Sequence, residues 1–167
     1  VKASGTVTQY TDMRSLLKSV EVEIGGQRVD KQYYRWQLAW ENLTYGDCQQ
    51  NALDVIARAT AAGASGDYYY LPLDFWFCRN AGLALPLIAL QYHEVKVRVE
   101  LAARTDMRTG DSTVAAPAAV NIDQGELLCD YIYLDTDERR RFAQVDHEYL
   151  IEQLQFTGAE PFSSTKP

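Results

Sequence analysis

The stretch LPLDFWFCRNAGLALPLIALQYHEVKVRVEL, residues 71–101, is too apolar to lie on a protein surface. It is also too interrupted for a membrane helix, because Arg79, Asn80 and Pro86 break its apolar runs and none of these runs reaches about 18 residues. The stretch therefore predicts two buried segments of a folded domain with a break between them.

Both segments alternate as β-strands do. In the first, Asp67 to Phe77, five large side chains fall on one face: Tyr69, Leu71, Leu73, Phe75 and Phe77. Aromatic residues on the opposite face predict a strand that is covered on both sides. In the second, His93 to Leu101, apolar and polar residues alternate strictly, which again predicts a strand. Between them Pro86 argues against a long helix, so we expect Leu83 to Leu90 to form a packed loop with one helical turn.

Further strands are expected on either side of this stretch. Val20 to Ile24 alternates aliphatic residues with glutamates, and the following Gly25-Gly26 suits a tight reversal because glycine tolerates positive φ. Glu126 to Leu134 and Tyr149 to Phe156 carry weaker strand patterns. The small and polar residues of Ala102 to Gly125 predict a long surface loop.

Three helices are expected in excursions between the strands. In Lys31 to Leu43, large apolar residues recur at spacings of three and four, which favours one face of a helix. Gln49 to Ala62 is a second candidate that ends at Gly63. Asp135, with Glu138 three residues later, is suited to cap a short third helix that ends near Gln144.

Length and charge limit the class of protein. The chain of 167 residues is long enough for one domain with a core, and its net charge of −7 disfavours direct binding to nucleic acid. The three cysteines form no CxxC pair, which suggests neither a zinc ribbon nor a disulfide framework. The first residues lack the charged and apolar pattern of a signal peptide, and nothing predicts membrane insertion.

The residues that could carry chemistry favour structural roles instead. His93 and His147 form no metal-binding spacing, and Asp135-Thr136-Asp137 stands at a predicted helix start, where carboxylates are favoured as caps. Arg139-Arg140-Arg141 lies beside acidic residues without interleaved aromatics, so a solvated or subunit-facing helix surface is preferred to a nucleic-acid site. We therefore expect no catalytic, cofactor-binding or metal-binding residue. Whether Asn42, in Asn42-Leu43-Thr44, is glycosylated stays open.

Several short strands with irregular connections indicate a mainly antiparallel β-sandwich with short helical excursions in its loops. The aromatic clusters, such as Tyr68-Tyr69-Tyr70 and Phe75-Trp76-Phe77, fit core or interface packing. They also allow an alternative function, a lectin-like carbohydrate-binding jelly roll in which exposed aromatics stack on sugar rings. The patterns alone do not choose the order of the strands.

Three blocks in the same order carry a family resemblance: VEVEIGGQRVDK (residues 20–31), residues 71–101, and DYIYLDTDERRRFAQVDHEYLIEQLQFTG (residues 130–158). They resemble the major capsid proteins of nucleocytoplasmic large DNA viruses, of the double jelly-roll type found in iridoviruses and phycodnaviruses. The resemblance implies that residues 1–157 are the N-terminal, eight-stranded jelly roll, without the family's N-terminal arm and first strand. It also implies that 158–167 are a linker towards a second jelly roll.

The same resemblance implies a structural protein and not an enzyme. Members of this family form homotrimers of pseudo-hexameric outline that tile an icosahedral shell, with minor capsid and penton proteins as further partners. The expected location is the virion capsid, assembled in the cytoplasm of the infected host cell. Six residues are the packing or assembly candidates, expected in the core or between neighbouring jelly rolls: Trp36, Trp40, Phe75, Trp76, Leu85 and Pro86.

Overall fold

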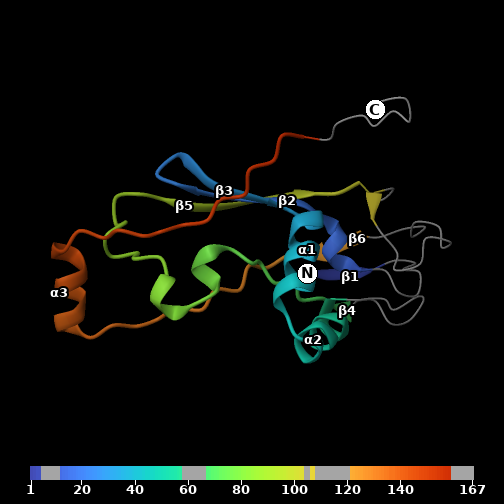
Figure 1. Ribbon diagram of the computed structural model, residues 1–167, viewed down its shortest axis with the longest axis horizontal. Helices are drawn as coiled ribbons and strands as arrows, with labels where there is room; N and C mark the ends of the chain where they lie inside the picture. Colours follow the sequence, from blue (N-terminus) through green and yellow to red (C-terminus); the bar gives the residue numbers. More distant parts are fainter. Residues whose placement is uncertain (5–11, 58–66, 104–105, 108–120, 159–167) are drawn as a thin grey trace.

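The fold is known from a computed structural model that describes residues 1–4, 12–57, 67–103, 106–107 and 121–158 (Figure 1). The strands are β1 (Lys2–Ser4), β2 (Leu17–Ile24), β3 (Gln27–Tyr33), β4 (Asp67–Tyr68), β5 (Val95–Leu101) and β6 (Asn121–Gln124). The α-helices are α1 (Tyr34–Thr44), α2 (Asp47–Ala57) and α3 (Thr136–Gln144). The described residues also form short 3₁₀ helices, among them η1 (Met13–Leu16), η2 (Trp76–Cys78) and η3 (Ala81–Leu83).

Two antiparallel sheets organise these elements, with strand orders β4-β1-β6 and β3-β2-β5. The longer sheet extends along the molecule in Figure 1, with α1 and α2 near one end and α3 at the other. In its register Val20 of β2 lies opposite Gln32 of β3 and Val99 of β5. The expected antiparallel jelly-roll class, with helices confined to connections, is confirmed by this arrangement and by the solved structures it matches below.

The β2–β3 hairpin closes on the two expected glycines. Ile24 pairs with Gln27, so Gly25 and Gly26 alone form the loop, with φ of 60° and 84°. Two positive φ angles give the twist that a two-residue hairpin needs. Gly25 has a second reason to lack a side chain, because a Cβ there would lie 2.8 Å from Nδ1 of His93.

The core consists of two neighbouring clusters. One combines Leu17, Val20 and Val22 of β2 with Phe75 from the segment before η2. The other surrounds η1 and contains Met13, Leu16, Tyr69 and Met107. Leu71 packs against both clusters, so the segment from Tyr69 to Phe77 joins them across the sheet.

This segment was expected to be a strand, and that expectation is right about its faces but wrong about its pairing. Tyr69 and Phe75 are buried while Tyr68 and Tyr70 are 60% and 53% exposed, so one face packs inward as predicted. The other face is not covered throughout, and only Asp67–Tyr68 forms a backbone ladder. Pro72 contributes to this because proline has no N–H to donate to a neighbouring strand.

Helix α1 buries a different face from the one that the sequence predicts. It begins after Tyr33, the last residue of β3, and its buried residues are Gln37 and Glu41. The predicted apolar face is turned outward instead, with Leu43 80% and Trp36 36% exposed. Spacing alone misleads here because a buried cation, described below, draws the polar face of the helix inward.

Helix α2 begins two residues before its predicted start at Gln49 and buries Leu53, while Ile56 is 38% exposed. Residues 58–62 of the prediction lie outside the described part of the chain. Helix α3 confirms the capping prediction, since Asp135 Oδ1 accepts a hydrogen bond of 2.9 Å from the Glu138 N–H. The 83–90 region forms the expected helical turn, in which the Ala89 and Leu90 N–H groups donate to Pro86 O.

The remaining strand predictions are corrected by the structure. Residues 126–134 form no strand, and most of their side chains are exposed, because no described segment pairs with them. Strand β6 instead lies within the predicted loop of Ala102 to Gly125, most of which is outside the described residues. The segment predicted as a strand from Tyr149 to Phe156 does lie beside β3 (Figure 1), but through side-chain contacts: Leu154 N–H donates to Asp30 Oδ1, not to a backbone carbonyl.

Phe75→Ala should lower the free energy of unfolding by about 3 to 5 kcal/mol, because it leaves a cavity between the segment and β2. Tyr70→Ala is the matched control on the outward face of the same segment, and about 0.5 kcal/mol is expected there. Urea unfolding monitored by tryptophan fluorescence measures both values. Equal losses in the two variants would contradict this account of the core.

Candidate functional site

The six candidate residues lie at three places in the described structure. Phe75 is 1% and Trp76 6% exposed, so both belong to the core or its margin. Leu85 and Pro86 are half-buried in the loop that follows η3. Trp36 and Trp40 lie next to each other on α1, with ring centroids 6.1 Å apart and ring planes tilted by 36°, and Trp36 reaches the surface. A core position is therefore wrong for Trp36, whereas a position between neighbouring jelly rolls stays a prediction.

Trp76, Leu85 and Pro86 all line one open groove with a volume of about 410 Å³. Phe142 of α3 and His147, which follows α3, also line this groove. The Trp76 ring contacts Tyr149 at 5.8 Å between centroids, and its Nε1–H is buried without a hydrogen-bond partner in the described structure. Through this contact, Trp76 links the side of the groove formed by the 83–90 loop to Tyr149, in the residues that follow α3.

Trp40 takes part in a contact that ties three distant segments together. The Arg79 guanidinium lies 4.1 Å from the centre of the Trp40 ring, a favourable cation–π geometry. The same guanidinium forms a 2.5 Å ion pair with Glu152. Because Glu152 is largely exposed, this ion pair contributes little stability by itself, but it orients Arg79 over the tryptophan.

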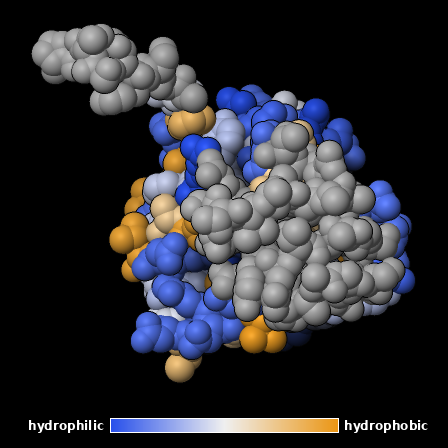
Figure 2. All heavy atoms as spheres, turned by 90° about the vertical axis from the view of Figure 1, so that its right-hand side faces the viewer, coloured by the Kyte–Doolittle hydropathy of each residue, from blue (hydrophilic) through white to orange (hydrophobic). Residues whose placement is uncertain are grey.

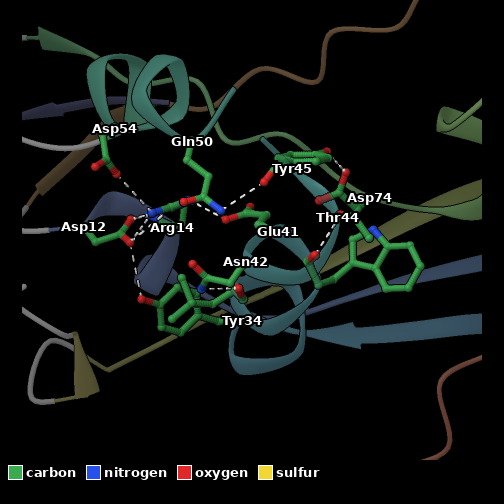
Figure 3. A network of polar contacts seen from close by, with 12 residues as sticks. Asp12, Arg14, Tyr34, Glu41, Asn42, Thr44, Tyr45, Gln50, Asp54 and Asp74 are labelled. Atoms are coloured by element: carbon green, nitrogen blue, oxygen red, sulfur yellow. Dashed lines mark hydrogen bonds and ion pairs between the residues drawn. The ribbon is translucent and has the colours of Figure 1, made fainter. Parts of the chain in front are cut away.

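A buried ion cluster is the feature that the sequence analysis missed. We call Asp12, Arg14, Glu41 and Asp54 the Arg14 cluster (Figure 3). Arg14, only 7% exposed, donates to Asp12 Oδ2 at 2.8 Å and to Glu41 Oε2 at 2.5 Å. Arg14 lies in η1 and Glu41 in α1, so the pair fixes the helix against the start of β2. The only signal in the sequence is a charged pair, Asp12 and Arg14, beside apolar residues.

The residues weighed for chemistry occupy structural positions. His93 precedes β5 and packs over Gly25, and the His147 ring Nε2 lies 2.7 Å from Phe142 O. Asp137 forms an ion pair with Arg140 at the exposed surface of α3. Asn42 is exposed, and its side-chain amide donates to Leu38 O within α1.

Among the described residues, no group of three or more histidine, cysteine or acidic side chains has the arrangement of a metal site. Within the same residues, each helix is too short or too polar to cross a bilayer.

Two antiparallel sheets with helices confined to their connections place the chain in the jelly-roll class, and sequence comparison identifies the family. The family model described as "Major capsid protein N-terminus" matches residues 1–135. The chain belongs to this family, which confirms the resemblance noted in its sequence.

Individual relatives agree. The chain is 52% identical to the major capsid protein of Pyramimonas orientalis virus, over 97% of this chain and 41% of that protein. It is 46% identical to the major capsid protein of Paramecium bursaria Chlorella virus 1, over 92% of this chain and 35% of that protein. The chain thus spans well under half the length of these relatives.

Solved structures show the same relationship. The quasi-atomic model of the PBCV-1 virus capsid matches with a TM-score of 0.75 and 38% identity, over 98% of this chain and 42% of that chain. The PBCV-1 VP54 crystal structure, fitted into a reconstruction of the virophage Sputnik, matches with a TM-score of 0.72 and 40% identity. That match covers 93% of this chain and 38% of the other.

Arg14→Met should destabilise the domain by about 3 to 5 kcal/mol, because it leaves Asp12 and Glu41 buried without their cation. Lys18→Met is the control, since Lys18 forms an exposed ion pair with Glu100 and solvent screens that pair. Urea unfolding of the two variants should therefore show a large loss for the first and a small one for the second. Comparable losses would show that burial of the cluster does not matter.

Proposed function

We propose that this chain is the N-terminal jelly-roll part of a major capsid protein that builds the icosahedral shell of a large double-stranded DNA virus. The observation that carries the proposal is the match of 98% of the chain to the PBCV-1 capsid model at 38% identity. Such a protein is a structural component and not an enzyme. Its location is the virion capsid, after assembly in the cytoplasm of the infected host cell.

The finer part of the proposal is a trimer of pseudo-hexameric outline, which requires two jelly rolls in each protomer. Residues 1–157 form one jelly roll in this proposal, and 158–167 lead towards another. Support comes from the PBCV-1 capsid chain, of which the aligned part is 42%, so that chain has room for a second domain of similar size.

Exposed apolar side chains supply candidate contacts between protomers or capsomers. They are numerous in residues 121–158, among them Leu128 at 71%, Tyr133 at 85% and Leu150 at 96% exposed. On the face shown in Figure 2, hydrophobic surface forms separate areas between hydrophilic ones. Exposed apolar surface of this kind is a common property of proteins that are buried in assemblies. Minor capsid and penton proteins are further proposed partners.

The lectin-like alternative would depend on Tyr68 and Tyr70, which present exposed rings on the outward side of one segment. Aromatic exposure alone is a weak argument for sugar binding, since interfaces between proteins are also enriched in tyrosine. The capsid proteins among the relatives therefore favour the shell function.

Trp76→Ala should lower the yield of trimers, because it removes the ring that supports the groove wall beside Leu85 and Pro86. Trp36→Ala should lower it as well while leaving the stability of the protomer nearly unchanged, since Trp36 is at the surface. Native mass spectrometry of the protein expressed from its complete open reading frame measures the trimer fraction. Tyr92→Ala is the control, because Tyr92 is an aromatic residue outside the candidate set and is 87% exposed. It should leave the trimer fraction unchanged.

An unchanged trimer mass and yield in both tryptophan variants would exclude these residues from assembly. A protein that stays monomeric in its natural sequence would contradict the trimer itself.

A further inference from the structure

The Arg14 cluster contains more negative than positive charge. The single guanidinium of Arg14 forms ion pairs with the carboxylates of Asp12, Glu41 and Asp54. The longest of these is the 3.7 Å distance from the Arg14 guanidinium nitrogen to Asp54 Oδ1. Glu41 is 3% exposed, so water does not solvate its charge. Figure 3 shows these side chains converging on Arg14: Asp12 from the N-cap of η1, Glu41 from α1 and Asp54 from α2. A buried carboxylate in such surroundings is costly to keep ionised.

Further groups face Glu41 from the neighbouring elements. Arg14 is the cation that acts on the pKa of Glu41, and a second cation, Arg79, acts on Tyr45. Tyr34 belongs to α1 and donates to Asp12, while Tyr45 follows α1 and donates to Asp74 Oδ1 at 2.5 Å. The other Asp74 oxygen, Oδ2, is buried without a hydrogen-bond partner in the described structure. The titratable and charged groups around Glu41 are Asp12, Arg14, Tyr34, Tyr45, Asp54 and Asp74.

We propose that the Arg14 cluster is a proton-sensitive clasp, which holds η1 against α1 and α2 more firmly as the pH falls from neutral to mildly acidic. The proton is taken up by Glu41. A neutral Glu41 still accepts the Arg14 hydrogen bond through its carbonyl oxygen, so the geometry of the clasp is retained. Uptake removes one of the mutually repelling negative charges around Arg14.

The direction of the effect follows from the pKa of Glu41. Burial is the main reason that this pKa is raised from 4.5 to about 6; Arg14 opposes the change, and the nearby Asp74, Asp12 and Asp54 support it. A carboxyl whose pKa is raised by folding contributes stability that is complete below the unfolded value of 4.5. That contribution is lost as the pH rises through about 6.

The clasp lies where its opening has structural consequences. Residue Leu16 ends η1 and Leu17 begins β2, so the cluster acts on the start of the central strand of the longer sheet. On the other side it holds α1, which carries Trp36 and Trp40. Weakening of the Arg14 cluster would therefore loosen the contact of α1 with η1 and with the start of β2. This effect does not depend on what the protein assembles into.

Hydrogen exchange of the protein from its complete open reading frame, corrected for intrinsic rates, measures local opening of η1 and α1. Between pH 5 and pH 7.5 the ratio of the wild-type to the Glu41→Gln opening constants should rise about eightfold. Glu148→Gln, at an exposed glutamate, is the matched control and should leave wild-type behaviour unchanged. A wild-type to Glu41→Gln ratio that is independent of pH would overturn the proposal.

A second variant keeps the test decisive if Glu41→Gln does not fold. Asp54→Asn removes one neighbouring negative charge from a side chain that is 41% exposed, so the fold should tolerate it. The midpoint of the pH dependence of exchange in η1 and α1 should then move to lower pH. A midpoint that stays in place would contradict the role of excess negative charge.

Discussion

The rest of the structure depends on the packing of one extended segment, Tyr69 to Phe77, against the aliphatic face of β2. Phe75 is buried on Val20 and Val22, and Leu71 contacts both core clusters. Because this segment makes almost no backbone ladder, side-chain burial holds it in place together with a few hydrogen bonds, such as that from the Gln32 amide to Asp74 O. A β-sandwich can thus be closed by a segment that is not itself a strand of either sheet.

The Arg14 cluster imposes the second constraint, and it explains an unusual helix. Glu41 must meet the buried guanidinium, so α1 turns Gln37 and Glu41 inward and leaves Trp36 at the surface. In an isolated globular domain this orientation would be unfavourable, because apolar rings are kept in water. In a shell protein the same rings are available for contacts with neighbouring copies, which joins the internal electrostatics to the proposed assembly.

Local signals in the sequence predicted local structure well. Alternation identified β2 and β5 as strands, although the predicted burial of β5 is wrong, since Val99 and Leu101 are about half exposed. Two glycines identified the hairpin turn, and Asp135 identified the start of α3. The predictions that failed depend on contacts between residues that lie far apart in the sequence. Residues 126–134 alternate like a strand but have no described neighbour to pair with, and the faces of α1 are set by Arg14, twenty-seven residues before Glu41. The family was recognisable from three blocks, whereas the site residues were not fixed by them.

Cryo-electron microscopy of purified virus particles tests the central claim most directly. The account predicts that the shell density is built from trimeric capsomers, and that the β3-β2-β5 sheet with α1 and the 69–77 segment fits one jelly roll of each protomer. Peptides of this protein should also be abundant in the same particles by mass spectrometry. A shell whose density accommodates no such jelly roll, in particles that lack these peptides, would contradict the account.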